Sequence, residues 1–242
     1  MEAPAVISLD EVRFSYSARG HPADGFGIAI SSMRISAGER VAIIGPSGSG
    51  KTTLLHLIAG VLHPHSGRVN VLGTDISSLP DAKRRSMRLE RIGMIFQEFE
   101  LLEYLTALEN ITLSARLSPS LPTTRGLPLA ARALELARIA GVEHVLHRKP
   151  RALSQGERQR IAICRALVTS PGVLLCDEPT GNLDPANTRA ILHMLTDRAS
   201  IGNASVVMVT HNHQSLDRFD RVIDSATFAA SPAATTPTPG AA

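Results

Sequence analysis

The chain has 242 residues, of which 43% are hydrophobic and 19% are charged, and its formal net charge is +3 at pH 7. This composition is ordinary for a soluble globular protein and excludes wholesale disorder; the length suits one large domain or one domain with an inserted lobe. The basic residues are spread along the chain, and only Lys83, Arg84 and Arg85 form a cluster. We therefore expect no nucleic-acid partner.

The two cysteines and the hydropathy of the chain indicate in which compartment the protein acts. Cys164 and Cys176 each lie in an apolar stretch, which favours buried free thiols and a reducing compartment. No apolar run reaches the roughly 18 residues of a membrane span, and the first residues do not resemble a secretory signal. We expect a chain that neither crosses a membrane nor is secreted, so that any role at a membrane depends on a partner.

Apolar segments predict two kinds of sheet. Short, partly alternating segments rich in Val, Ile and Phe predict strands of a mostly antiparallel sheet at residues 5–16, 28–35 and 67–72. Compact apolar runs separated by helical stretches predict a parallel sheet covered on both faces, with strands at residues 41–44, 173–176 and 206–210. In such α/β folds ligands bind at the carboxyl ends of the parallel strands.

Helical periodicity marks residues 51–61, directly after the first parallel strand, and also residues 107–117 and 128–140. The last two predict an α-helical lobe, at about residues 98–165, inserted into a domain that spans residues 1–228. Residues 229–242 are almost entirely Ala, Pro, Thr and Gly, a composition that predicts a disordered tail.

A glycine-rich segment between the first parallel strand and its helix matches the phosphate-binding pattern G-x-x-x-x-G-K-[ST]. Its residues are Gly45, Pro46, Ser47, Gly48, Ser49, Gly50, Lys51 and Thr52, and Thr53 follows. Glycines let backbone N–H groups surround phosphate, Lys51 would reach the β- and γ-phosphates, and the Thr52 hydroxyl would bind Mg²⁺. The pattern does not distinguish an ATPase from a nucleotide kinase, a GTPase or a motor.

Two acidic residues end the second parallel strand. Asp177 is placed to hold Mg²⁺ through its water shell, and Glu178 to orient and deprotonate an attacking water. The same acids, followed by Pro179, are also typical of a helix or turn start. Their combination with the phosphate-binding segment favours the catalytic interpretation.

About twenty residues before these acids stands a segment that resembles the signature of the ABC ATPases: Leu153, Ser154, Gln155, Gly156 and Glu157. Gln155 and Glu157 depart from the commonest form of the signature, whereas Ser154 and Gly156 match it. Ser154 and Glu157 also fit a capping box at the start of a helix over residues 157–168, and both interpretations are compatible.

The resemblance extends to about residue 223 and implies an α/β P-loop NTPase core with an N-terminal antiparallel β-subdomain and the inserted helical subdomain. It implies that Tyr16 stacks on adenine, that Gln97 links Mg²⁺ to the helical lobe, and that His211 contacts the γ-phosphate. His211 and His213 could alternatively form a metal pair. Leu183 and Asp184 match the loop that crosses the dimer, and Asp184 also suits a helix N-cap.

In this family two copies enclose ATP, each signature touching the nucleotide held by the other copy. The resemblance therefore implies ATP and Mg²⁺ as cofactors, with a second copy and an integral membrane permease as partners at the cytoplasmic face of the inner membrane. The segments around Gln97 and Asn182 most resemble the lipoprotein-releasing, macrolide-efflux and cell-division branch. That branch favours export or extraction; mechanical signalling without transport and a soluble ABC ATPase remain alternatives.

The C-terminal edge of the domain is expected to be shortened. Members of the family normally continue into a final hairpin with a glycine turn, whereas this chain runs from Arg221 to Thr227 and then into the tail.

Overall fold

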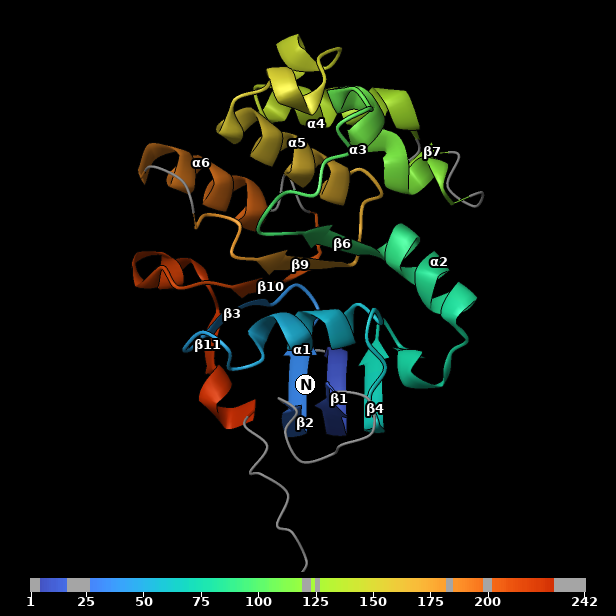
Figure 1. The fold of residues 1–242 in the computed structure, drawn as a ribbon, viewed down its shortest axis with the longest axis vertical. Coiled ribbons are helices and arrows are strands. Elements are labelled where there is room, and N and C mark those ends of the chain that lie inside the picture. The colour runs from blue at the N-terminus through green and yellow to red at the C-terminus, as the bar shows by residue number, and fades with distance from the viewer. Residues whose placement is uncertain are drawn as a thin grey trace, which may run out of the picture.

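A computed structural model describes residues 5–16, 27–118, 123–124, 127–181, 185–197 and 202–228. Figure 1 shows three layers: an antiparallel sheet at one end, a parallel sheet in the middle, and a group of helices at the other end. The tail predicted for residues 229–242 lies outside the described residues.

The antiparallel sheet has four strands in the order β2-β1-β4-β5. Their bounds are β1 Ala5–Ser15, β2 Gly27–Ser36, β4 Ser66–Val71 and β5 Thr74–Asp75. Ile7 and Leu9 of β1 are fully buried, because alternate side chains of a strand point to the same face and this face packs on the core. The three longer strands confirm the predicted antiparallel segments.

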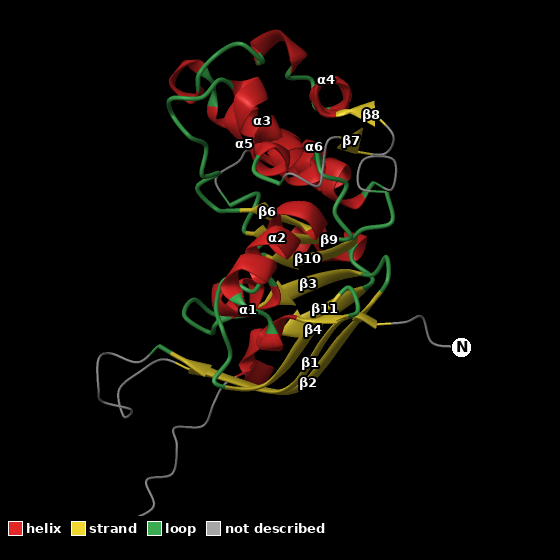
Figure 2. Ribbon diagram, turned by 90° about the vertical axis from the view of Figure 1, so that its right-hand side faces the viewer, coloured by secondary structure: helices red, strands yellow, loops and turns green. Residues whose placement is uncertain are grey.

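The parallel sheet has five strands in the order β11-β3-β10-β9-β6. Their bounds are β3 Arg40–Ile44, β6 Ile92–Ile95, β9 Val173–Asp177, β10 Ser205–Val209 and β11 Arg221–Asp224. Helix α1 (Lys51–Ile58) covers one face, and α5 (Gln155–Leu167) and α6 (Pro185–Thr196) cover the other (Figure 2). Covering on both faces explains why β10 is buried throughout.

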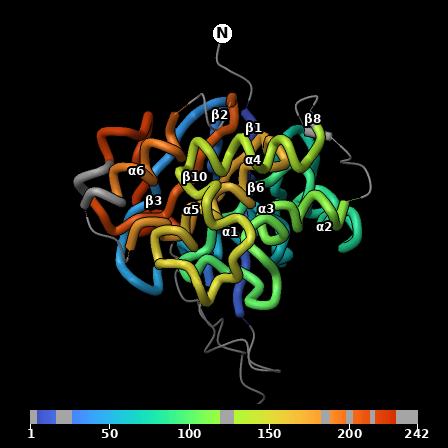
Figure 3. The backbone as a smooth tube through the Cα atoms, turned by 90° about the horizontal axis from the view of Figure 1, so that it is seen from above, coloured from blue at the N-terminus to red at the C-terminus, as the bar shows by residue number. Residues whose placement is uncertain are grey.

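The helical layer consists mainly of α3 (Ala107–Arg116), α4 (Leu129–Ile139) and α5. Figure 3 looks down on these helices, which lie over the parallel sheet. Ile111, Leu136 and Ile161, one from each helix, are fully buried in a common core. This core also includes residues of β9 and β10, so the helical layer is packed onto the sheet.

Several elements are not evident from the sequence pattern. Helix α2 (Asp81–Arg91) buries only Met87 and therefore lacks an apolar stripe. Strand β11, in the region where a shortened edge is expected, pairs in parallel with β3, and a short 3₁₀-helix, η5 (Ser225–Phe228), follows it. The described C-terminal residues thus extend the parallel sheet and form no hairpin.

Both cysteines are buried free thiols, as predicted. Burial raises the pKa of the Cys164 thiol to about 12 and raises that of Cys176 as well, which keeps both thiols protonated and unreactive at neutral pH. Over the part of the chain that the structure describes, no helix has the length and apolar character needed to span a bilayer.

Candidate nucleotide site

The phosphate-binding segment joins β3 to α1 at the carboxyl edge of the parallel sheet. Gly48 and Gly50 adopt left-handed backbone conformations, with φ of 77° and 91°, which glycine adopts without strain. Lys51 is only 6% exposed, and its ammonium donates to the carbonyls of Gly45 at 3.0 Å and Pro46 at 2.7 Å. The charge is held inside the loop by neutral acceptors, so a phosphate would offer it a stronger, charged partner.

Thr52 and Asp177 meet at the same edge although 125 residues separate them. The Thr52 hydroxyl donates to Asp177 Oδ2 at 2.8 Å. A hydroxyl and a carboxylate oxygen are the kind of ligand that Mg²⁺ prefers beside phosphates. Two of the three predicted metal residues, Thr52 and Asp177, therefore fit this ion chemically. Among the described residues no cluster of three or more His, Cys, Asp or Glu side chains offers another metal site.

Glu178 and His211 form the next pair along this edge. The Nε2 atom of His211 lies 2.9 Å from Glu178 Oε1. Glu178 has a left-handed φ of 44°, and its backbone N–H donates to the Val209 carbonyl at 3.0 Å. Side chains at the ends of β9 and β10 are thus brought together, as the predicted roles of Glu178 and His211 require. A non-glycine residue in this conformation is uncommon and is a feature of many functional sites.

Tyr16 lies beside the start of α1. Its hydroxyl is 3.4 Å from the Thr53 hydroxyl, and its ring packs edge-to-face on Phe14 with centroids 4.9 Å apart. Tyr16 remains 45% exposed, which leaves ring surface for a nucleotide base. Gln97 follows β6 at the same carboxyl edge, but within the described residues it makes no hydrogen bond to Thr52 or Asp177.

The signature segment forms the predicted capping box at the start of α5. Ser154 Oγ accepts from the Glu157 backbone N–H at 3.3 Å, and Glu157 Oε2 accepts from the Ser154 N–H at 2.7 Å. The backbone hydrogen bond from Ser154 lowers the pKa of the Glu157 carboxyl. Leu153 is buried beneath this turn. Helices α5 and α1 lie on opposite sides of the parallel sheet (Figure 1), and among the described residues the hydrogen bonds of the signature and of the phosphate loop do not join the two segments.

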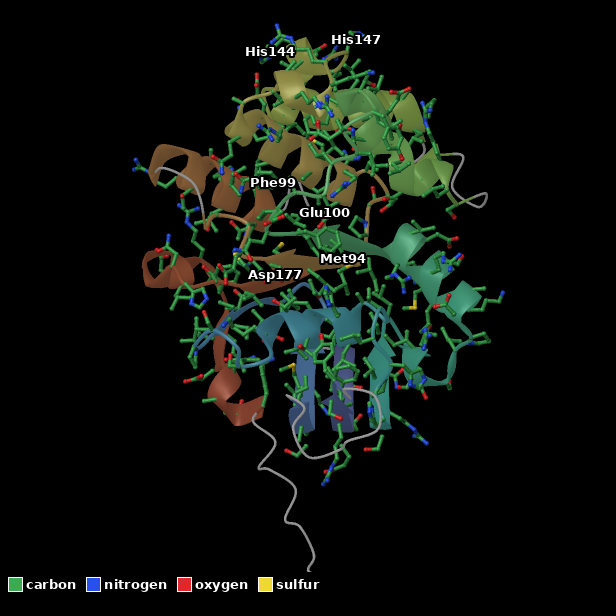
Figure 4. The ribbon with its side chains drawn as sticks, viewed as in Figure 1. Met94, Phe99, Glu100, His144, His147 and Asp177 are labelled. Carbon is green, nitrogen blue, oxygen red and sulfur yellow. The ribbon has the colours of Figure 1, made fainter. Side chains whose placement is uncertain are left out.

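One arginine missed by sequence reasoning fixes the segment after Gln97. Arg165 of α5 donates to the Phe99 carbonyl at 2.6 Å and the Glu100 carbonyl at 2.5 Å. Burial lowers the pKa of Arg165. Phe99 and Glu100 have left-handed φ values of 63° and 49°, and Figure 4 shows them between the helical layer and the strand end that carries Asp177. The left-handed conformations are therefore held by charge-assisted hydrogen bonds.

The same segment is tied to α3 through a buried amide. The Asn110 side chain accepts from the Leu102 N–H at 2.8 Å and donates to the carbonyls of Leu102, Leu105 and Thr106. No sequence pattern distinguishes such an asparagine from a surface residue of the same helix. The predicted dimer-loop residues Leu183 and Asp184, and the side chain of His213, lie outside the described residues.

The sequence matches two protein-family models and is similar to proteins of named function. A family model described as "ABC transporter" matches residues 29–181, and one described as "AAA domain, putative AbiEii toxin, Type IV TA system" matches residues 146–217. The chain is 38% identical to the "Lipoprotein-releasing system ATP-binding protein LolD" of Xanthomonas euvesicatoria pv. vesicatoria over 227 residues, covering 92% of this chain and 89% of the relative. It is 40% identical to the LolD protein of Psychrobacter arcticus over 189 residues, 78% of this chain and 82% of the relative.

A solved structure has the same fold. It is described as a dimeric post-hydrolysis state of the ATP-binding cassette MJ0796 bound to ADP and Pi, and it matches with a TM-score of 0.78 and 32% identity over 90% of this chain and 93% of that one. The family model covers more than half of the chain, and the phosphate loop, acidic strand end and capped signature helix stand where the sequence predicts them. The chain therefore belongs to the ABC transporter family, as an ATP-binding domain that hydrolyses ATP.

Proposed function

We propose that this chain powers a membrane permease which extracts or exports a lipophilic or protein substrate. The observation that carries this proposal is the 38% identity, over 92% of the chain, to a protein named as the ATP-binding component of a lipoprotein-releasing system. The chain would act at the cytoplasmic face of the inner membrane, held there by the permease. Its domain would span residues 1–228, with the helical subdomain at about residues 98–165.

The hydrolytic step would use groups at the carboxyl edge of the parallel sheet. Lys51 would leave the carbonyls of Gly45 and Pro46 for the phosphates of ATP. Thr52 and Asp177 would hold Mg²⁺, with Gln97 joining them on closure, and the ion would neutralise charge on the phosphates. Glu178 would accept the proton of the attacking water, while His211, 2.9 Å away, fixes its carboxylate and faces the γ-phosphate.

Two copies would enclose the nucleotide head to tail. Helix α5, whose first turn carries the signature, and helix α1, which follows the phosphate loop, lie on opposite faces of the sheet (Figure 1), so Ser154 and Gly156 would serve a nucleotide held by another copy. A capped helix N-terminus presents N–H groups and a partial positive charge, which suit a γ-phosphate. Tyr16 would stack on adenine, and residues 183 and 184 would cross the dimer. A dimer of the MJ0796 cassette supports this arrangement.

A groove beside the anchored segment is the proposed seat for a cytoplasmic helix of the permease. This cavity of about 270 Å³ lies among α2, β6, α3 and α5, and its apolar lining includes Leu89, Met94, Phe96, Leu113 and Leu117. Glu100 and Arg165 also line it, so an occupant would touch the residues that follow Gln97. An apolar groove of this kind suits the apolar face of an amphipathic helix. The neighbouring loop over residues 98–105 would complete the contact.

Replacing Leu117 by Asp is expected to abolish co-purification of the permease while leaving the ATPase activity of the isolated chain unchanged. Leu117 is 60% exposed in the groove lining, and a charge there would have to be desolvated against the permease helix. The measurement is affinity purification of the tagged chain from gently solubilised membranes, followed by mass spectrometry.

Ile139→Asp is the matched control, because Ile139 is an exposed apolar residue of the same helical layer that does not line the groove. Retention of the permease by the Leu117→Asp variant would contradict the proposed seat. Recovery of no membrane protein by the unchanged chain would favour a soluble ABC ATPase. A permease that couples to ATP hydrolysis but moves no substrate would favour mechanical signalling.

A further inference from the structure

The C-terminal segment touches the phosphate loop at a point that the catalytic roles above do not use. Ser225 opens the 3₁₀-helix η5 directly after β11, and its side chain is only 1% exposed. Its hydroxyl shares a hydrogen bond of 2.6 Å with the hydroxyl of Ser49, which stands 176 residues earlier in the chain. The contact joins the last described strand to the loop that receives phosphate.

Ser225 also lies against the first residue of the loop. Gly45 has a left-handed φ of 139°, and a Cβ built on it would collide with the Ser225 hydroxyl. The hydroxyl therefore occupies the space that the missing side chain of Gly45 leaves open. The Ser225 hydroxyl oxygen thus contacts two parts of the loop: Gly45, which is its first residue, and Ser49, which lies near its end.

The position of Ser225 is fixed on both sides. Before it, Asp224 pairs with Ile44 in the parallel ladder between β11 and β3, so the two strand ends run side by side into the loop and η5. After it, Phe228 is 3% exposed and belongs to the core formed with β2 and α1. The carboxylate of Asp224, the last residue of β11, accepts from the Ala226 N–H of η5 at 2.9 Å. These contacts present the hydroxyl rigidly to the loop.

We infer that Ser225 is a positioning residue that holds the phosphate loop in its binding conformation and thereby raises the affinity for ATP. The loop contains three glycines with left-handed backbones, at positions 45, 48 and 50, and such residues lose the most conformational freedom when they are ordered. A loop already fixed by an outside contact does not have to be ordered when nucleotide binds, and this pre-organisation strengthens binding. The inference depends on ATP binding alone and not on the proposed permease.

The test is a double-mutant cycle on the full chain. Ser225→Ala, Ser49→Ala and the double variant are titrated with MANT-ATP and Mg²⁺, and KM and kcat for ATP are measured alongside. Ser225→Ala is expected to raise the Kd about two- to tenfold, the range for one net hydrogen bond, with kcat at saturating ATP unchanged. The double variant is expected to bind no more weakly than the weaker single variant, because both changes remove the same bond.

Thr227→Ala is the matched control, since Thr227 lies in the same helix and its hydroxyl donates to the Asp224 backbone carbonyl, not to a residue of the phosphate loop. It is expected to leave the Kd unchanged. An unchanged Kd in Ser225→Ala, or losses that add in the double variant, would overturn the inference. A lower melting temperature without a change in Kd would overturn it as well, because Ser225 would then serve only the stability of the fold.

Discussion

Replacing Glu178 by Gln is expected to lower ATP turnover by about 10²- to 10⁴-fold, the usual effect of removing a general base. The amide keeps the shape of the side chain and its contact with His211, which lies 2.9 Å from the carboxylate, but it cannot take the proton of the attacking water. ATP should still bind, so the closed dimer should accumulate. Phosphate release measures the first effect, and size-exclusion chromatography with ATP and Mg²⁺ measures the second.

Glu143→Gln serves as the control for this change. Glu143 is an exposed acid of the helical layer that pairs with Arg138, and neutralising it should leave turnover unaltered. Full activity in the Glu178→Gln variant would refute the assignment of the base. Loss of ATP binding in that variant would instead place Glu178 among the residues that hold the nucleotide.

Replacing Gly156 by Glu is expected to reduce hydrolysis on the order of 10²-fold or more, the scale seen when donors to a transition-state anion are lost. Gly156 lies in the first turn of α5, two residues after the N-cap Ser154, and an acid there would repel the γ-phosphate offered by the other copy. Binding of MANT-ATP to the monomer should be unchanged. Weaker binding to the monomer would contradict a role in the opposite copy.

Mixing two inactive variants tests directly whether the signature of one copy serves the nucleotide of the other. Gly156→Glu and Lys51→Ala chains should each be inactive alone, for different reasons. In a mixed dimer, one site combines an intact phosphate loop with an intact signature, so mixing should restore part of the hydrolysis. If both residues served the same chain's site, mixing would restore none.

The sequence was sufficient to predict the parts of the site that a pattern defines. The phosphate loop needs a strand before it and a helix after it, and the structure has β3 and α1 there. Asp177 and Glu178 end a buried strand, and parallel topology brings that end beside Thr52. The capping box of Ser154 and Glu157 is a local interaction between neighbouring residues, so it follows from spacing alone.

Contacts between distant residues could not be predicted in this way. Arg165 bonds two carbonyls about 65 residues away, and backbone carbonyls carry no signal in the sequence. The pairing of Ser49 with Ser225 joins two common residues with no pattern between them. Helix α2 escaped prediction because its charged residues leave one buried position, and β11 because it is an edge strand in which Arg221 and Val222 are both exposed.

Through its hydrogen bonds to the Phe99 and Glu100 carbonyls, Arg165 attaches α5 to the segment that borders the proposed permease groove. The signature stands at its first turn, and the arginine stands about 15 Å further along at 1.5 Å per residue. Under the proposed function, a tilt imposed on the first turn of α5 by nucleotide held in the other copy would be carried along this short helix to Arg165. Closure of the dimer around ATP and movement of the permease would then be coupled through rotation of α5. A substitution that made α5 more flexible would uncouple the two events while leaving the nucleotide site and the groove intact.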